Sequence, residues 1–186
     1  NTNNYWFFGG LAGVYFDTLG VHTMTGNLGV YEGSASISDG CGLLFYTDAE
    51  KIWNKDRQVM ANGVGIGGKC GTISHAGSST QAALIVRQPA SDSLFYVFTT
   101  DCKEDNLADG LRYSIVNMNK NNGLGEVTLK NQLLFANAEE KLTAAKHANG
   151  CDIWIISHKH NTSDFYAYLL TGAGLNVNPV ISSTGQ

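Results

Sequence analysis

The most reactive side chains in this sequence belong to four cysteines that lie far apart along the chain. None of them forms a C-x-x-C pair, and this spacing argues against a zinc site, whose thiolate ligands usually come in such pairs. An even number of cysteines in a chain rich in turns is typical of an exported protein with one or two disulfides. Four buried free thiols are the alternative interpretation. The four are Cys41, Cys70, Cys102 and Cys151.

One disulfide follows from the expected order of the strands. If residues 82–86 and 94–100 form adjacent antiparallel strands, the start of the first lies beside the end of the second. Cys70 precedes the first strand and Cys102 closely follows the second, so their Cα atoms can approach to the roughly 4.4–6.8 Å that a bridge requires. We therefore predict a Cys70–Cys102 disulfide. The other two cysteines lie in similar turns of distant units, so each is expected to be free or to bond another chain: Cys41 and Cys151.

Four carboxylates follow the second of these strands within a short loop. Hard oxygen ligands at such spacing could hold Ca²⁺, although the EF-hand pattern is absent. A solvated acidic turn is the alternative. The candidate ligands are Asp101, Glu104, Asp105 and Asp109, and no other cofactor is indicated.

Two histidines at the end of a predicted strand are a weaker metal candidate. The period-two alternation of a strand places His158 and His160 on one face. No carboxylate or cysteine companion is visible in the nearby sequence, and a polar strand end is the favoured interpretation.

Catalytic motifs are absent or imperfect. The sialidase Asp-box has the spacing Ser-x-Asp-x-Gly-x-x-Trp, but in the segment 36–40 Asp39 comes one residue late and no Trp follows in place. Neither a Gly-x-Ser-x-Gly elbow nor a Walker-type loop is present. The glycine-rich run 63–68 follows no clear βα unit and is interpreted as a flexible turn. The sequence therefore favours a non-catalytic protein, with a polysaccharide hydrolase as an alternative.

Composition sets the broad class. The 186 residues are 43% hydrophobic and 15% charged, which suits a folded core and is well below the usual quarter of charged residues. The net charge of −4, without a basic stripe, argues against a nucleic-acid partner.

No run approaches the roughly 18 apolar residues of a membrane span. The start of the chain lacks the basic and apolar segments of a signal peptide, and its first polar residues lead directly into the aromatic residues 5–8. A mature chain looks like this after its signal peptide has been cleaved, and a shortened chain would look the same.

Strand signals dominate the chain, and the 22 glycines suit tight turns. The segment 136–148 has a helical composition, but we favour a strand there. Strands are expected near 5–8, 13–16, 35–38, 43–48, 51–54, 82–86, 94–100, 111–116, 126–135, 141–147, 152–158, 164–170 and 179–183.

A strand motif recurs along the sequence. Leu44-Phe45-Tyr46 returns 50 residues later as Leu94-Phe95-Tyr96 and more loosely as Ile153-Trp154-Ile155. Each copy follows a strand and a polar turn and precedes another aromatic strand. A period of about 40–60 residues with four strands is typical of a WD-like β-propeller blade; a β-sandwich is the alternative.

The predicted fold is thus all-β, a partial β-propeller of about three four-stranded antiparallel sheets plus an N-terminal strand pair. The units are 1–30 for the pair and approximately 30–65, 78–136 and 138–186 for the blades. Because propellers have about 4–8 blades, three blades do not close a ring. The expected partners are the rest of a longer chain or further copies of this one.

Several motifs in order resemble the N-terminal, propeller-like region of very large secreted surface proteins of Bacteroidota. The resemblance covers nearly the whole chain. It implies export by type IX secretion, attachment to the outer cell surface and a role in adhesion or gliding motility, with immunoglobulin-like repeats and a sorting domain further along such chains. It carries over no catalytic residue. The motifs are 5–9, 12–17, 32–39, 43–48, 53–60, 78–81, 110–116 and 140–144.

The same resemblance suggests two modification sites. Asp17-Thr18-Leu19 and Asp92-Ser93-Leu94 look like the Asp-Ser/Thr-aliphatic acceptor of O-glycosylation in exported proteins of this phylum. Thr18 and Ser93 are therefore candidate glycosylation sites, and the chain is a candidate glycoprotein.

These observations lead to an expected function. We interpret the chain as a non-catalytic interaction module that binds a glycan or a protein at the cell surface. Aromatic side chains at strand ends could supply a stacking surface. A self-assembling ring or filament component and a hydrolase whose site is completed by further blades are the two alternatives.

Overall fold

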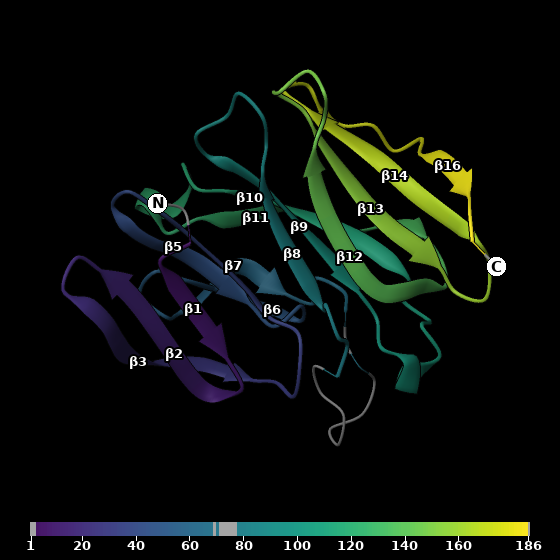
Figure 1. Cartoon of the computed structure of the whole chain (residues 1–186). Coiled ribbons are helices and arrows are strands. Elements are labelled where there is room, and N and C mark those ends of the chain that lie inside the picture. The colour runs from purple at the N-terminus through teal and green to yellow at the C-terminus, as the bar shows by residue number, and fades with distance from the viewer. Residues whose placement is uncertain (1–2, 69, 71–77, 186) are drawn as a thin grey trace.

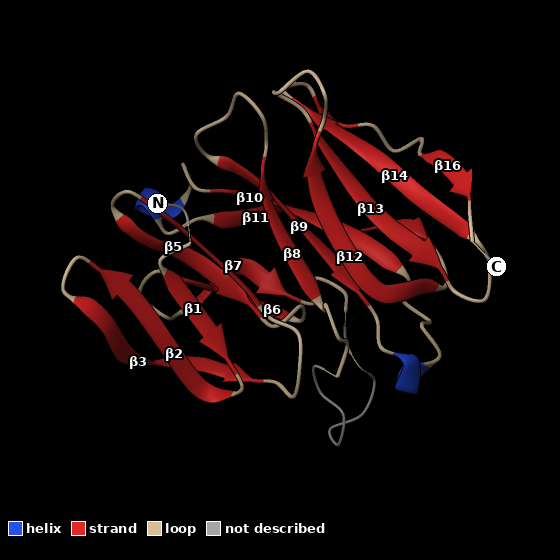
Figure 2. Cartoon of the chain, in the orientation of Figure 1, coloured by secondary structure: helices blue, strands red, loops and turns tan. Residues whose placement is uncertain are grey.

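The computed structural model of the chain describes residues 3–68, 70 and 78–185. The described residues are almost entirely strand, and two single 3-10 turns, η1 (Lys103–Asp105) and η2 (Asn121–Gly123), are their only helices (Figure 2). The predicted all-β class is therefore confirmed. Figure 1 shows the sheets in chain order, from the first three strands in purple at one end to the last strands in green and yellow at the other.

The first sheet has three antiparallel strands: β1 (Tyr5–Phe8), β2 (Gly10–Asp17) and β3 (Gly20–Gly29). A strand pair was predicted here, and the prediction missed β3. This strand alternates buried or half-buried residues with exposed ones and contains three glycines, so its composition resembles a loop. Pairing with β2 keeps it extended.

The second sheet has eight strands in the order β4-β5-β6-β7-β11-β10-β9-β8. It consists of two antiparallel groups of four, joined by one parallel pair at Ala61 and Glu126. The predicted separate sheets are therefore fused. The join is strengthened by Asn62 Nδ2, which donates to Val127 O at 2.7 Å. The strands are β4 (Ala35–Asp39), β5 (Gly42–Thr47), β6 (Lys51–Asn54), β7 (Val59–Val64), β8 (Ala83–Arg87), β9 (Leu94–Thr100), β10 (Leu111–Asn117) and β11 (Glu126–Phe135).

The third sheet contains the segment whose composition suggested a helix. Residues 138–146 form a strand, as favoured from the sequence, and pair with the following strand. The sheet is β12 (Ala138–Lys146), β13 (Ile153–Lys159), β14 (Asp164–Thr171) and β15 (Gly174–Leu175), with β16 (Val180–Ser183) paired to β14.

Three apolar clusters hold successive groups of strands together. Phe7 stacks on Tyr46 with ring centroids 4.0 Å apart, which joins the first sheet to β5. Phe45 meets Phe95 edge to face between the two halves of the eight-stranded sheet. Phe98 belongs to the cluster that joins the second half to the third sheet. Each internal group is thus buried on both faces, as strongly apolar strands require.

The internal repeat has a different register from the one seen in the sequence. β5 and β9 both end in a fully buried threonine followed by aspartate, Thr47-Asp48 and Thr100-Asp101. This alignment corresponds to a shift of 53 residues instead of 50 and matches Phe45 with Phe98. Both phenylalanines pack toward the next group along the chain, so the structural repeat follows burial and strand ends more closely than the aromatic triplet does.

Candidate functional site

Cys70 and Cys102 form the predicted disulfide, with their Cα atoms 5.3 Å apart. The bridge lies where the sequence argument placed it, because the backbone N–H of Thr100 donates to the carbonyl of Ala82 and brings the end of β9 beside the start of β8. It ties the segment before β8 to the acidic loop that follows β9.

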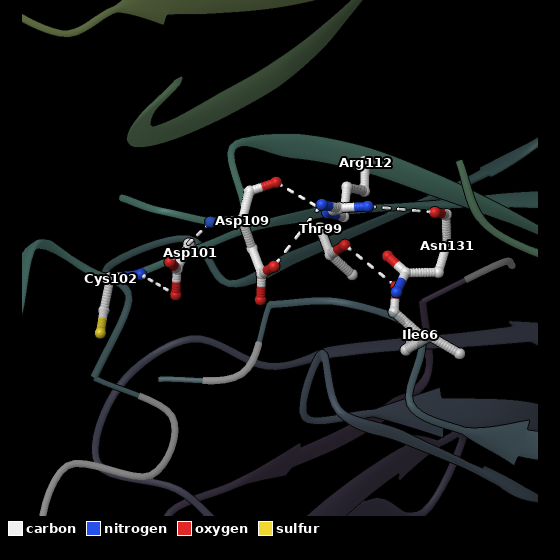
Figure 3. Close-up of polar contacts among 7 residues, drawn as sticks. All are labelled: Ile66, Thr99, Asp101, Cys102, Asp109, Arg112 and Asn131. Atoms are coloured by element: carbon white, nitrogen blue, oxygen red, sulfur yellow. Dashed lines mark hydrogen bonds and ion pairs between the residues drawn. The ribbon is translucent and has the colours of Figure 1, made fainter. Parts of the chain in front are cut away.

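The candidate calcium ligand Asp101 serves this loop instead. Its carboxylate is fully buried and accepts hydrogen bonds from the backbone N–H of Cys102 at 2.8 Å and of Asp109 at 3.0 Å (Figure 3). Burial raises the pKa of Asp101, although the two amides oppose the shift. Asp48, which directly follows β5, also caps the loop after its strand, because its Oδ1 accepts hydrogen bonds from the N–H groups of Glu50 and Lys51. Asp101 is therefore a loop cap repeated from one group of strands to the next.

The remaining acidic residues of the loop do not join Asp101 in a cage. Asp109 pairs with the guanidinium of Arg112 at 3.6 Å, and Arg112 also donates to the carbonyl of Asn131 (Figure 3). Glu104 and Asp105 lie in η1. In the described part of the chain the only group of three metal-ligating side chains is Cys70, Cys102 and Glu104, and its two sulfurs are already bonded to each other. The described residues thus offer no assembled set of carboxylate ligands for Ca²⁺.

The glycine-rich run 63–68 is the end of β7 and a packed loop after it, not the flexible turn expected. Ile66 is fully buried and its carbonyl accepts from Thr99 Oγ1 (Figure 3). Gly67 has φ +94°, and a Cβ there would lie 2.8 Å from Asn131 Oδ1, so glycine is needed both for the backbone conformation and for space.

His158 and His160 have different partners. His160 Nδ1 lies 2.5 Å from Glu139 Oε1, whereas the His158 ring packs against Phe165 with centroids 4.7 Å apart. Glu139 is the carboxylate companion that the local sequence did not reveal, because it lies on β12 and the histidines lie on or just after β13. The two histidines therefore make separate contacts at the end of β13.

The other predicted site residues lie in hairpin turns. Cys41 and Cys151 are exposed free thiols. Their turns are alike, because Asp39 and Asn149 each accept two backbone N–H groups across the turn. The near-match to an Asp-box at Asp39 is thus a turn cap.

The two candidate glycosylation sites differ in accessibility. Thr18 is exposed in the β2–β3 turn. Ser93 is half-buried, and its carbonyl accepts from the N–H of Met118. Steric access therefore favours Thr18 as an acceptor.

A cavity of about 430 Å³ lies at the end of the third sheet where β12 begins and β13 ends. Such a volume suits a small-molecule site. Glu139 is the only carboxylate among its described lining residues, whereas most glycoside hydrolases need a pair. The lining residues are Gln81, Glu139, Lys141, Leu142, Thr143, Ile156, Ser157, His158 and Phe165.

Two sheet faces at the ends of the row are uncovered. We call first open face the side of the first sheet that points away from β5, where Trp6 is 53% and Phe8 43% exposed; it comprises Trp6, Phe8, Val14, Phe16 and Val21. We call last open face the side of the third sheet that points away from β9; it comprises Trp154, Ile156, Phe165, Ala167 and Leu169. Phe165 is 37% exposed and the rest of this face is half-buried.

No protein-family model matches the chain, and no similar curated protein or solved structure was found. Among the described residues, no helix has the length and apolar character needed to cross a membrane. The conclusions on function accordingly depend on the site geometry and on the resemblance stated above.

Proposed function

We propose that the chain is a non-catalytic interaction module of the cell exterior, built from propeller-type blades, that binds a protein or a glycan. The observation that carries the proposal is the pair of open faces. Large exposed apolar patches mark interaction surfaces in soluble proteins, and the equivalent faces of the internal groups are buried against a neighbouring sheet. A further sheet with an apolar face, from the same chain or another, is the partner that these faces fit.

The arrangement of the first strands supports the propeller part of the proposal. β1 contacts β4, β4 contacts β8, and β8 contacts β12, so the first strands of successive groups lie side by side. In a propeller the first strands line the central channel. A cavity of about 380 Å³ lies among the first strands of the second, third and fourth groups, with Ile37, Leu84 and Ala144 in its lining.

Export is supported by the disulfide, because such bonds persist mainly in oxidising compartments. The resemblance to secreted surface proteins adds the type of location and a role in adhesion or gliding. Exposed Thr18 leaves room for a glycan on the β2–β3 turn.

The proposal is tested by binding of an apolar fluorescent dye to the purified chain. The wild-type chain should bind the dye, and Trp6→Arg should remove part of the signal because it places a charge on the first open face. Tyr31→Arg is the matched control, since Tyr31 is an exposed aromatic residue outside the sheets. A chain that binds no dye, or that hydrolyses polysaccharides until Glu139→Gln stops it, would contradict the proposal.

A self-assembling component is the second candidate, and the location of the two open faces at opposite ends of the row favours it. Copies could stack head to tail, first open face on last open face, into a ring or a filament. Sedimentation should then show a mass that rises with concentration. Trp6→Arg and Leu169→Arg should each abolish that rise, because a head-to-tail contact needs both faces.

A further inference from the structure

We propose that the 430 Å³ cavity on the third sheet binds a neutral saccharide, with Phe165 as its stacking platform. This inference rests on the proposed function and names the class of one partner and the place where it binds. The cavity occupies the polar end of the last open face, where His158 pairs with Phe165 across β13 and β14.

Several polar side chains line this cavity. Gln81 Oε1 accepts from the N–H of Leu142 at 3.0 Å, and Glu139 Oε1 is held by His160. Within the described residues, no intramolecular partner is found for the amide nitrogen of Gln81, the hydroxyl of Thr143 or the ring nitrogens of His158. These groups offer donors and acceptors to hydroxyl groups of a ligand.

The charge and shape of the lining select a neutral, partly apolar ligand. Glu139 and Lys141 contribute one charge of each sign, so neither a strongly anionic nor a strongly cationic ligand is favoured. The rings of Phe165 and His158 are tilted by 43° to each other, and Ile156 adds an aliphatic side chain to the lining. The face of a sugar ring carries C–H groups that pack on an aromatic ring, while its hydroxyls need hydrogen bonds. This lining meets both needs.

The cavity is already ordered by contacts of the fold. The N–H of Gln81 donates to the carbonyl of Glu140 at 3.0 Å, which ties the segment before β8 to β12. Ser157 Oγ donates to the carbonyl of Lys141 at 3.2 Å and ties β13 to β12. A site fixed in this way loses little conformational freedom on binding, which favours affinity.

The test is saturation-transfer NMR of the whole chain with cellobiose, maltose, chitobiose and xylobiose, and with digalacturonate as a charged comparison. At least one neutral disaccharide should bind, with weaker or no binding of digalacturonate. Phe165→Ala should weaken that binding about tenfold, which corresponds to a lost stacking contact of about 1.4 kcal/mol. Tyr31→Ala should leave it unchanged. Glu139→Gln, which keeps the shape of the side chain, provides a second variant should Phe165→Ala lose its circular dichroism signal.

The proposal is overturned if no neutral disaccharide binds, if only digalacturonate or a peptide competes for the cavity, or if Phe165→Ala and Tyr31→Ala act equally. Dye binding through Trp6 is measured on the other end of the molecule. Its persistence in a chain without saccharide binding would therefore reject the cavity site and leave the proposed function standing.

Discussion

The central eight-stranded sheet and the third sheet contain strands of the same alternating type, yet their apolar side chains have different surroundings. Phe98 on β9 is fully buried against the third sheet, whereas Ile156, on the corresponding side of β13, is half-exposed. Burial in this molecule therefore depends on whether a strand group has a neighbour on each side, and the strand pattern alone does not determine it. This difference is the basis for regarding the uncovered faces as interaction surfaces.

The largest effect should come from comparing these two positions directly. Phe98→Ala removes a fully buried ring and should lower the free energy of unfolding by about 3–5 kcal/mol. Ile156→Ala should cost on the order of 1 kcal/mol, because this side chain is only partly buried. Chemical denaturation of both variants measures the difference. Equal losses would mean that the last open face is covered in the chain itself.

The second-largest difference in stability is expected between replacing the disulfide-bonded cysteines and replacing the free ones. Replacing Cys70 and Cys102 together by alanine opens a loop with a sequence separation of 32 residues and should cost about 3–4 kcal/mol. Replacing Cys41 and Cys151 by serine should change the stability little, because both thiols are exposed. The measurement is thermal unfolding under non-reducing conditions, and a large loss in the second variant would show that these thiols are bonded or packed.

The two aspartate caps provide a finer comparison. Asp101 uses both carboxylate oxygens, so Asp101→Asn turns one acceptor into a donor facing the N–H of either Cys102 or Asp109 and should cost about 1–3 kcal/mol. Asp48 uses Oδ1 for both of its bonds, and Asp48→Asn should be tolerated within about 0.5 kcal/mol. Denaturation midpoints measure both. Addition of Ca²⁺ or a chelator should move neither value, and a shift with Ca²⁺ would revive the calcium site.

Asp48 also predicts a small pH dependence with a definite sign. Burial raises the pKa of Asp48 above its ordinary value of 3.8, against the hydrogen bonds from Lys51 and Glu50. The native state therefore holds the proton more firmly than the unfolded chain does. This difference stabilises the native state fully below pH 3.8, and the stabilisation is lost as the pH rises through the raised pKa. The stability of the wild type minus that of Asp48→Asn should fall over this range. A difference that rises with pH would contradict the assignment.

Local patterns predicted much of this fold, and long-range contacts explain what they missed. Alternation of apolar residues located most strands, and strand adjacency located the Cys70–Cys102 bridge. β7 was missed because Asn62, with φ +56°, and Gly63 interrupt its pattern. It pairs with the neighbouring β6 and also with β11, which lies far along the chain. The Glu139–His160 contact likewise joins separate strands. Neither the β7–β11 pairing nor the Glu139–His160 contact is marked by a residue spacing that can be seen in a single sequence.

The candidate site was predictable only in part. The acidic loop after β9 was found, but its role as a cap became clear only when Asp101 proved buried with both oxygens bonded to amides. The cavity beside Phe165 combines residues from the segment before β8 and from β12, β13 and β14. Because its residues come from four separate segments, the sequence showed only aromatic residues at strand ends.

Hydroxyl-radical footprinting tests the central claim most directly, by comparing the isolated chain with the protein taken from its native source. The account predicts that Trp6 and Phe8 on the first open face, and Trp154 on the last, react in the isolated chain and are protected in the native protein. Tyr31 should react equally in both. Equal reactivity of the open faces in the two preparations would contradict the claim that these faces are interaction surfaces.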